Sequence, residues 1–259
     1  MTEKSGCAGC RNTDPSAFDI PFTMAFQPIV DLTNNTIWGY EALVRGVDGE
    51  SAYQVLSQVN DQNRYAFDQA CRVKAIKLAG ENLSPDTSTK LSINFMPNAV
   101  YEPKACIRAT LAAAERVGFD PTRLMFEFTE NEQMSDVSHV SHIVDEYRKM
   151  GFYTALDDFG AGYAGLSLLA KFQTDLIKID MELVRGIENS RSRRAIVSGI
   201  VGICNELGIA VLAEGVETKD EALTLRSAGI DLFQGYYFAR PAVERFLTAS
   251  DINTLQVGK

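Results

Sequence analysis

The chain has 259 residues, 46% of them hydrophobic, a size typical of one α/β barrel or of two small domains. Its formal net charge is −9 at pH 7, which argues against a basic surface for duplex nucleic acid or for an anionic membrane. No run of apolar residues approaches the roughly 18 that a membrane helix needs, and the first residues lack an apolar signal core, so we expect a cytoplasmic protein.

Residues 1–20 contain too few apolar side chains to pack, which predicts a flexible N-terminal arm followed by one folded domain over residues 21–259. Cys7 and Cys10 lie in this arm at the C-x-x-C spacing of metal and redox sites. Zinc takes four ligands, however, and the sequence offers no second pair at this spacing. An intermolecular zinc or redox role therefore stays open for the two cysteines.

Two short apolar runs, residues 24–31 and 36–44, flank a turn-forming stretch and predict an antiparallel hairpin. Within the second run, Glu41 and Arg45 are four positions apart. A strand places such positions on the same face, so the two side chains could line one site. A surface ion pair is the alternative on this evidence alone.

The rest of the chain alternates between helical and strand patterns. Residues 52–79 have helical spacing with a break near 61–63, and a unit of short apolar strand, loop and amphipathic helix then repeats. The predicted helices between the strands cover residues 103–117, 138–150, 191–207 and 219–228. Alternation over the whole chain indicates a parallel sheet that closes into a (β/α) barrel.

Each predicted barrel strand ends in a polar side chain. The strand ends in a barrel meet at one rim, so these side chains should share one space. They are Asn94, Glu127, Asp157, Asp158, Lys178, Glu214 and Gln234. Adjacent carboxylates repel each other, and a chain keeps Asp157 and Asp158 together at a strand end chiefly when a cation neutralises them. The pattern predicts a metal site at the rim, although any one residue could instead cap a helix.

The sequence contains a series of motifs: Phe26-Gln27-Pro28-Ile29-Val30, Glu41-Ala42-Leu43, Ile93-Asn94-Phe95, Phe126-Glu127-Phe128-Thr129-Glu130, Asp157-Asp158-Phe159-Gly160, Ile177-Lys178-Ile179-Asp180, Ala213-Glu214-Gly215-Val216-Glu217 and Gln234-Gly235-Tyr236. In order and spacing they resemble the motifs of the EAL-domain phosphodiesterases of cyclic di-GMP. The resemblance implies a TIM-like (β/α)8 barrel with an antiparallel first strand. It also implies hydrolysis of cyclic di-GMP to linear pGpG with two Mg²⁺ or Mn²⁺ ions per site, in a homodimer that pairs through helices near the Asp157 loop and residues 180–194.

The resemblance also assigns roles to single residues. Metal ligands would be Glu41, Asn94, Glu127, Asp157, Asp158 and Glu214, with Asp157 shared by both ions. Lys178 would lie beside the reacting phosphate, and Glu214 is a candidate general base. Substrate contacts would be Gln27, Leu43, Arg45, Gln234 and Pro241. Glu130 and Glu217 would support the ligands without touching the metal, and Glu130 would hold the loop from Asp157 to Tyr163.

Some motifs look most like the EAL domains fused to blue-light flavin sensors, but the arm before Phe22 is too short to fold as such a sensor, so flavin is not expected. Two alternatives remain open from the sequence. One is a catalytically weak EAL module that binds cyclic di-GMP or a protein partner and signals by contact. The other is an unrelated barrel metalloenzyme that enolises a carboxylate substrate with Lys178 as base.

Overall fold

A β-hairpin begins the part of the chain that the computed structural model describes, which is residues 20–253 except 61, 86, 97–99, 101, 130–136 and 163–164. Strands β1 (Thr23–Asp31) and β2 (Thr36–Arg45) pair antiparallel. The turn between them contains Asn35 at φ 51°, a left-handed conformation that asparagine tolerates better than most residues. The predicted hairpin is therefore confirmed.

Seven further strands complete the sheet. They are β3 (Lys90–Asn94), β4 (Leu124–Thr129), β5 (Tyr153–Phe159), β6 (Leu176–Ile179), β7 (Ala210–Ala213), β8 (Leu232–Phe233) and β9 (Ala242–Val243). Strands β2 to β8 run parallel in chain order, and β1 closes the barrel by pairing antiparallel with both β8 and β2. The short β9 pairs with β1 near Phe26, outside the eight-stranded ring. This topology confirms the TIM-like barrel with an antiparallel first strand.

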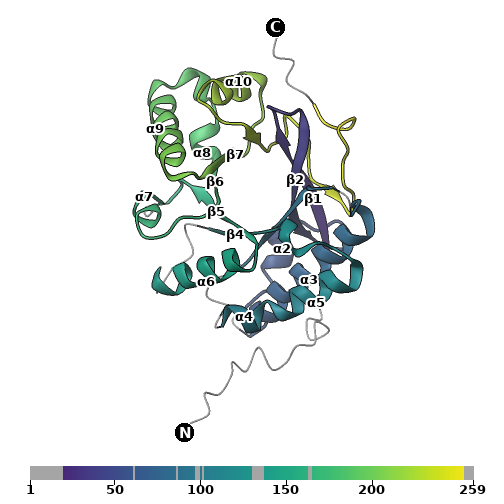
Figure 1. The fold of residues 1–259 in the computed structure, drawn as a ribbon. Coiled ribbons are helices and arrows are strands. Elements are labelled where there is room, and N and C mark those ends of the chain that lie inside the picture. The colour runs from purple at the N-terminus through teal and green to yellow at the C-terminus, as the bar shows by residue number, and fades with distance from the viewer. Residues whose placement is uncertain are drawn as a thin grey trace.

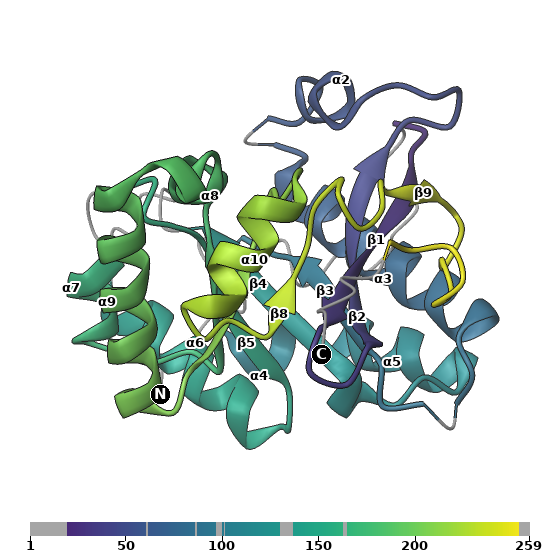
Figure 2. The same ribbon diagram turned by 90° about the horizontal axis from the view of Figure 1, so that it is seen from above.

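Helices surround the strands (Figure 1). They are α2 (Ala52–Leu56), α3 (Arg64–Asn82), α4 (Pro103–Cys106), α5 (Arg108–Val117), α6 (Val137–Lys149), α7 (Gly165–Leu169), α8 (Met181–Val184), α9 (Arg191–Leu207) and α10 (Lys219–Ser227). The view from above places α2 beside the hairpin, away from the other helices (Figure 2). Within the described part of the chain, none of them has both the length and the apolar character to cross a bilayer.

The helix limits follow from local capping. Helix α9 has the predicted bounds because the Ser190 hydroxyl accepts from the amide of Arg193 at its start and Gly208 takes φ 70° at its end. The predicted single helix over 103–117 is wrong in one respect. Two helices, α4 and α5, cover these residues, and they meet at the buried Ile107, which keeps right-handed helical angles.

The interior of the barrel is built in two layers. The lower layer is apolar and consists of Ile29, Met125, Ala155, Leu176, Leu212 and Leu232, with Trp38 packed against it. Side chains two positions apart on a strand point to the same face, so the positions two residues nearer the rim also point inward. Those positions are polar: Gln27, Glu127, Asp157, Lys178, Glu214 and Gln234. The fold thereby sets a polar layer directly on an apolar floor.

Candidate active site

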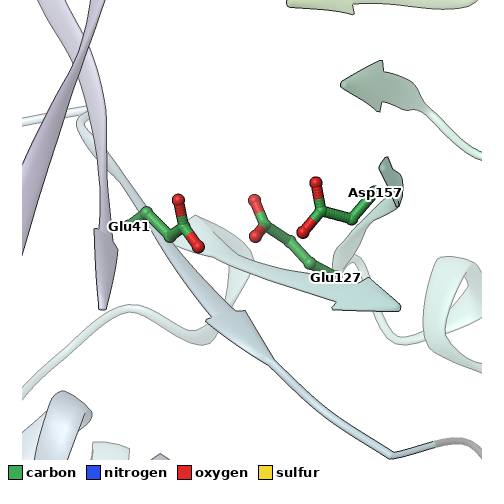
Figure 3. A group of neighbouring side chains, drawn as sticks. All are labelled: Glu41, Glu127 and Asp157. Atoms are coloured by element: carbon green, nitrogen blue, oxygen red, sulfur yellow. The ribbon is translucent and has the colours of Figure 1, made fainter. Parts of the chain in front are cut away.

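Carboxylates from three strands meet inside the rim of the barrel. Oxygens of Glu41 on β2, Glu127 on β4 and Asp157 on β5 lie within 4.8 Å of one another, and the three side chains point toward a common space (Figure 3). Asp157 also belongs to a second group of the same kind, with Asp158 and Glu214. Five predicted metal ligands are thus brought together, with Asp157 common to both groups.

Lys178 supplies the positive charge beneath these carboxylates. Its side chain is fully buried, and Nζ lies 2.6 Å from Glu214, 2.8 Å from Glu127, 3.3 Å from Asp157 and 3.4 Å from Glu41. An isolated ammonium group would be costly at this depth, and only close, well-placed anions offset that cost. The lysine is therefore a shared counter-ion that holds four carboxylates around one point.

The adjacent Asp157 and Asp158 are brought to the same site by a distortion of β5. Successive residues of a regular strand point to opposite faces, so two neighbouring aspartates would normally diverge. Here the pairing of β5 with β6 shifts between Leu156 and Phe159, and Asp158 takes φ 54°, an uncommon value for a residue other than glycine. The amide of Asp158 donates to Asp157 Oδ1 at 2.9 Å, which fixes the turn.

Side-chain amides complete the polar layer. Gln234 Nε2 donates to Glu41 Oε2 at 2.7 Å and to Gln27 Oε1 at 3.2 Å, and Asn94 Nδ2 donates to Glu41 Oε1 at 3.0 Å. Gln234 can reach this position because Gly235 follows it. A Cβ on that glycine would lie 2.1 Å from the backbone oxygen of Val216. Glu41 is therefore oriented from both sides by amides predicted from the sequence.

Burial and mutual repulsion raise the pKa of several of these carboxyl groups. Burial raises the pKa of Glu127 to about 8, with Glu41 and Asp157 adding to the increase and Lys178 opposing it. Burial likewise raises the pKa of Asp158 to about 6 and that of Glu214 well above its usual value. Burial alone would lower the pKa of Lys178, but its four anionic neighbours raise it well above the usual value. The metal-free site therefore retains protons that free carboxyl groups would release.

These shifts predict how the stability of the metal-free protein depends on pH. Between the usual 4.5 and about 8 for Glu127, the folded protein binds more protons than the unfolded chain does. Its free energy of unfolding must then fall as the pH rises through this window. We expect the unfolding temperature in chelator to drop across it, and excess Mg²⁺ or Mn²⁺ to reduce the drop. An unfolding temperature in chelator that stays constant or rises over the window would contradict the assignment.

A cleft of about 420 Å³ opens above the carboxylates. The predicted residues among its walls are Gln27, Glu41, Leu43, Asp158, Glu214, Glu217 and Gln234. Among the other wall residues, Asp180, Met181, Arg185 and Tyr236 received no role from the sequence, although Asp180 and Tyr236 belong to the motifs quoted there. Asp180 and Met181 directly follow β6, so the strand-end rule that found Lys178 could have found them. Arg185 lies further along the loop, where no periodic signal marks it.

Two predicted substrate contacts are not among the residues that line this cleft. Arg45 ends β2, and its Nη1 donates to the carbonyl of Val44 at 2.6 Å. Pro241 is half-buried and directly precedes β9. Glu217, predicted to support the metal ligands, lies at the cleft wall with its carboxylate on Arg185. Glu130, Tyr163, Cys7 and Cys10 fall outside the described residues, and their roles stay predictions.

The residues present suit hard divalent cations. Mg²⁺ and Mn²⁺ prefer oxygen ligands, and the two groups offer carboxylate oxygens with Asn94 alongside. Glu127 Oε1 is buried and has no hydrogen-bond partner among the described residues. A buried carboxyl oxygen without a partner is costly unless a cation or water meets it. The donor set and this oxygen both fit a metal site.

Comparison with known proteins matches residues 20–241 to the family model described as "EAL domain". Among curated proteins, the chain is 34% identical to the "Blue light- and temperature-regulated antirepressor BluF" of Escherichia coli K12, covering 83% of this chain and 53% of BluF. It is 28% identical to the "Cyclic di-GMP phosphodiesterase NbdA" of Pseudomonas aeruginosa, covering 89% of this chain and 31% of NbdA. The chain thus spans about half or less of these relatives.

Solved structures agree. A standalone EAL protein of Vibrio cholerae O395 in its c-di-GMP-bound form is 52% identical, with a TM-score of 0.85, covering 91% of this chain and 97% of that one. A manganese and cyclic di-GMP complex of Klebsiella pneumoniae BlrP1 is 39% identical, with a TM-score of 0.79, covering 87% of this chain and 57% of that one. From its motifs, its barrel and these relatives, the chain belongs to the EAL domain family.

Proposed function

We propose that this protein hydrolyses cyclic di-GMP to linear pGpG with the help of two Mg²⁺ or Mn²⁺ ions. The observation that carries the proposal is the pair of carboxylate groups sharing Asp157 at the rim of an EAL barrel. Relatives support it, since NbdA is named a cyclic di-GMP phosphodiesterase and BlrP1 was solved with manganese and cyclic di-GMP.

The residues of the site would have different roles in the proposed reaction, according to their positions. Glu41, Asn94, Glu127 and Asp157 would hold one ion, and Asp157, Asp158 and Glu214 would hold the other. Bound divalent cations supply Lewis acidity, which neutralises phosphate charge and makes water a better nucleophile at neutral pH. Lys178 would keep its positive charge throughout the reaction and stabilise the anionic transition state from below.

Glu214 and Gln234 would act at the floor of the cleft. Glu214 faces the cleft, and burial raises its pKa well above the usual value, which would make it a better proton acceptor than an ordinary carboxylate. Gln234 donates to Glu41 and lines the same cleft, where it would orient bound water. Gln27 and Leu43 would contact the nucleotide from the hairpin. Arg45 and Pro241 do not line the cleft described above, so they would contact the ligand only if it extended beyond the cleft or if these residues moved toward it.

The test is a hydrolysis assay with cyclic di-GMP in Mg²⁺, in Mn²⁺ and in excess chelator, with the products separated by chromatography. We expect pGpG to accumulate with either metal and to be absent in chelator. Intact cyclic di-GMP after prolonged incubation with both metals would reject the proposal. Formation of pGpG at equal rates in chelator would reject the metal requirement alone.

A second candidate is a non-hydrolytic EAL module that signals by contact. It is favoured by the likeness to BluF, which is named an antirepressor. The same assay separates the two, because this candidate predicts binding of cyclic di-GMP or of a partner without pGpG. Membership of the EAL family removes the alternative of an unrelated enolising enzyme.

The homodimer and the cytoplasmic location stay predictions. An apolar groove of about 700 Å³ lies along the expected contact region, between the end of β5 and helix α9. Leu166, Ile196 and Ile203 line it and are substantially exposed. These side chains support pairing at this face.

A further inference from the structure

The side chains that line the cleft above the carboxylates are predominantly acidic. Its described lining includes five carboxylates: Glu41, Asp158, Asp180, Glu214 and Glu217. Arg185 is the single cation among those lining residues. Lys178 lies beneath the cleft, where four carboxylates already surround it. Among the described residues that line the cleft, Arg185 is therefore the one accessible cation that an anionic ligand would meet.

Arg185 has a fixed backbone and an exchangeable side-chain partner. It ends the short helix α8, its carbonyl accepts from Arg193 Nη1, and the next amide, of Gly186, donates to Glu221 Oε1 at 2.9 Å. The guanidinium pairs with Glu217 at 2.5 Å, and the two side chains are 32% and 45% exposed. Ion pairs this exposed contribute little to stability, so a stronger anion can replace the partner at small cost.

A cyclic dinucleotide brings two phosphodiester groups into this cleft. In the proposed reaction, the paired carboxylate groups and their ions engage one phosphate. The other phosphate would face Asp180 and Glu217, and like charges at short range in a partly buried cleft repel strongly. A guanidinium can meet this phosphate with two parallel hydrogen bonds, a geometry in which Arg surpasses Lys.

We propose that Arg185 exchanges Glu217 for the non-reacting phosphate of the cyclic dinucleotide and so makes the site prefer ligands with two phosphodiesters over ligands with one. This inference rests on the proposed function and adds to it the group that reads the second anion. It also assigns Glu217 the task of holding the guanidinium at the wall until ligand arrives.

The test compares two ligands by isothermal titration calorimetry: cyclic di-GMP, with two phosphodiesters, and the linear dinucleoside monophosphate GpG, with one. Titrations run in Ca²⁺, since BlrP1 was also solved as a calcium and cyclic di-GMP complex, and chromatography verifies that the nucleotide stays intact. The proteins are wild type, Arg185→Ala, Arg185→Lys and the control Arg245→Ala, whose side chain is 69% exposed outside the cleft lining.

We expect Arg185→Ala to weaken cyclic di-GMP binding about tenfold and to leave GpG binding unchanged. The affinity of Arg185→Lys for cyclic di-GMP should lie between those of wild type and Arg185→Ala, and the affinity of Arg245→Ala should equal that of wild type. Equal weakening for both ligands, or no weakening for either, would overturn the inference. If Arg185→Ala does not fold, the comparison uses Arg185→Lys, which keeps the positive charge but lacks the guanidinium geometry. If the wild-type protein hydrolyses cyclic di-GMP and Arg185→Ala binds it as tightly as wild type does, this inference alone is wrong. If the wild-type protein binds neither nucleotide, the proposed function is wrong as well.

Discussion

Asp157→Asn is expected to lower kcat/KM for cyclic di-GMP about a thousandfold or more. Asp157 is the one residue that belongs to both carboxylate groups, so this change removes an anionic oxygen from each of them while keeping the side chain's size. It also removes one of the four anions around Lys178. The measurements are steady-state kinetics and the number of Mn²⁺ ions bound per chain.

Two variants make this result specific. Glu41→Gln affects the first carboxylate group alone, so it should retain more bound Mn²⁺ than Asp157→Asn does. Asp145→Asn is the matched surface control, because the Asp145 carboxylate is 58% exposed on α6 and 4.0 Å from Arg148. It should behave as wild type. An Asp157→Asn protein that binds two ions and turns over normally would disprove the shared-ligand arrangement.

Lys178→Met is expected to destabilise the metal-free protein by roughly 3–5 kcal/mol near neutral pH. The lysine is fully buried, and its removal leaves the carboxylates of Glu41, Glu127, Asp157 and Glu214 without their common counter-ion. The loss should shrink as the pH falls, because protonation then removes the repulsion that the lysine offsets. Urea unfolding in chelator at several pH values measures both effects.

The control for this variant is Lys77→Met. Lys77 pairs with Glu81 at 3.9 Å on the surface of α3, where the side chains are 62% and 49% exposed, so its loss should change stability very little. Adding Mg²⁺ or Mn²⁺ should restore much of the stability of Lys178→Met, since a divalent cation supplies the missing charge. A Lys178→Met protein as stable as wild type in chelator would show that the carboxylates do not depend on this cation.

Much of the site was predictable from the sequence because barrel strands impose a simple rule. The carboxyl ends of the barrel strands meet at one rim, so polar residues at these ends lie near one another. Glu127, Asp157, Lys178 and Gln234 could therefore be placed together from the sequence. The hairpin was equally clear, since two apolar runs flank a turn. What the rule could not give was the depth of Lys178, which depends on the sum of four neighbouring charges.

The loops were harder to predict for a physical reason. Arg185 directly follows the four-residue helix α8, and no hydrophobic period links it to the cleft it lines. Arg45 is the last residue of β2 and Pro241 directly precedes β9, and neither position in the chain reveals whether the side chain lines the cleft. The left-handed backbone conformation of Asp158 could not be predicted from the sequence either, because an Asp-Asp pair is compatible with many turn conformations.

The apolar floor of the barrel has a consequence for how the molecules of the proposed reaction would enter and leave the protein. Ile29, Met125, Ala155, Leu176 and Leu212 are fully buried directly under the polar layer. In the proposed reaction, water and nucleotide would therefore enter through the cleft at the rim of the barrel, and the cleaved product would leave by the same route. A linear product that stayed in the cleft would obstruct the next molecule of cyclic dinucleotide, so the turnover rate would depend on the rate of product release.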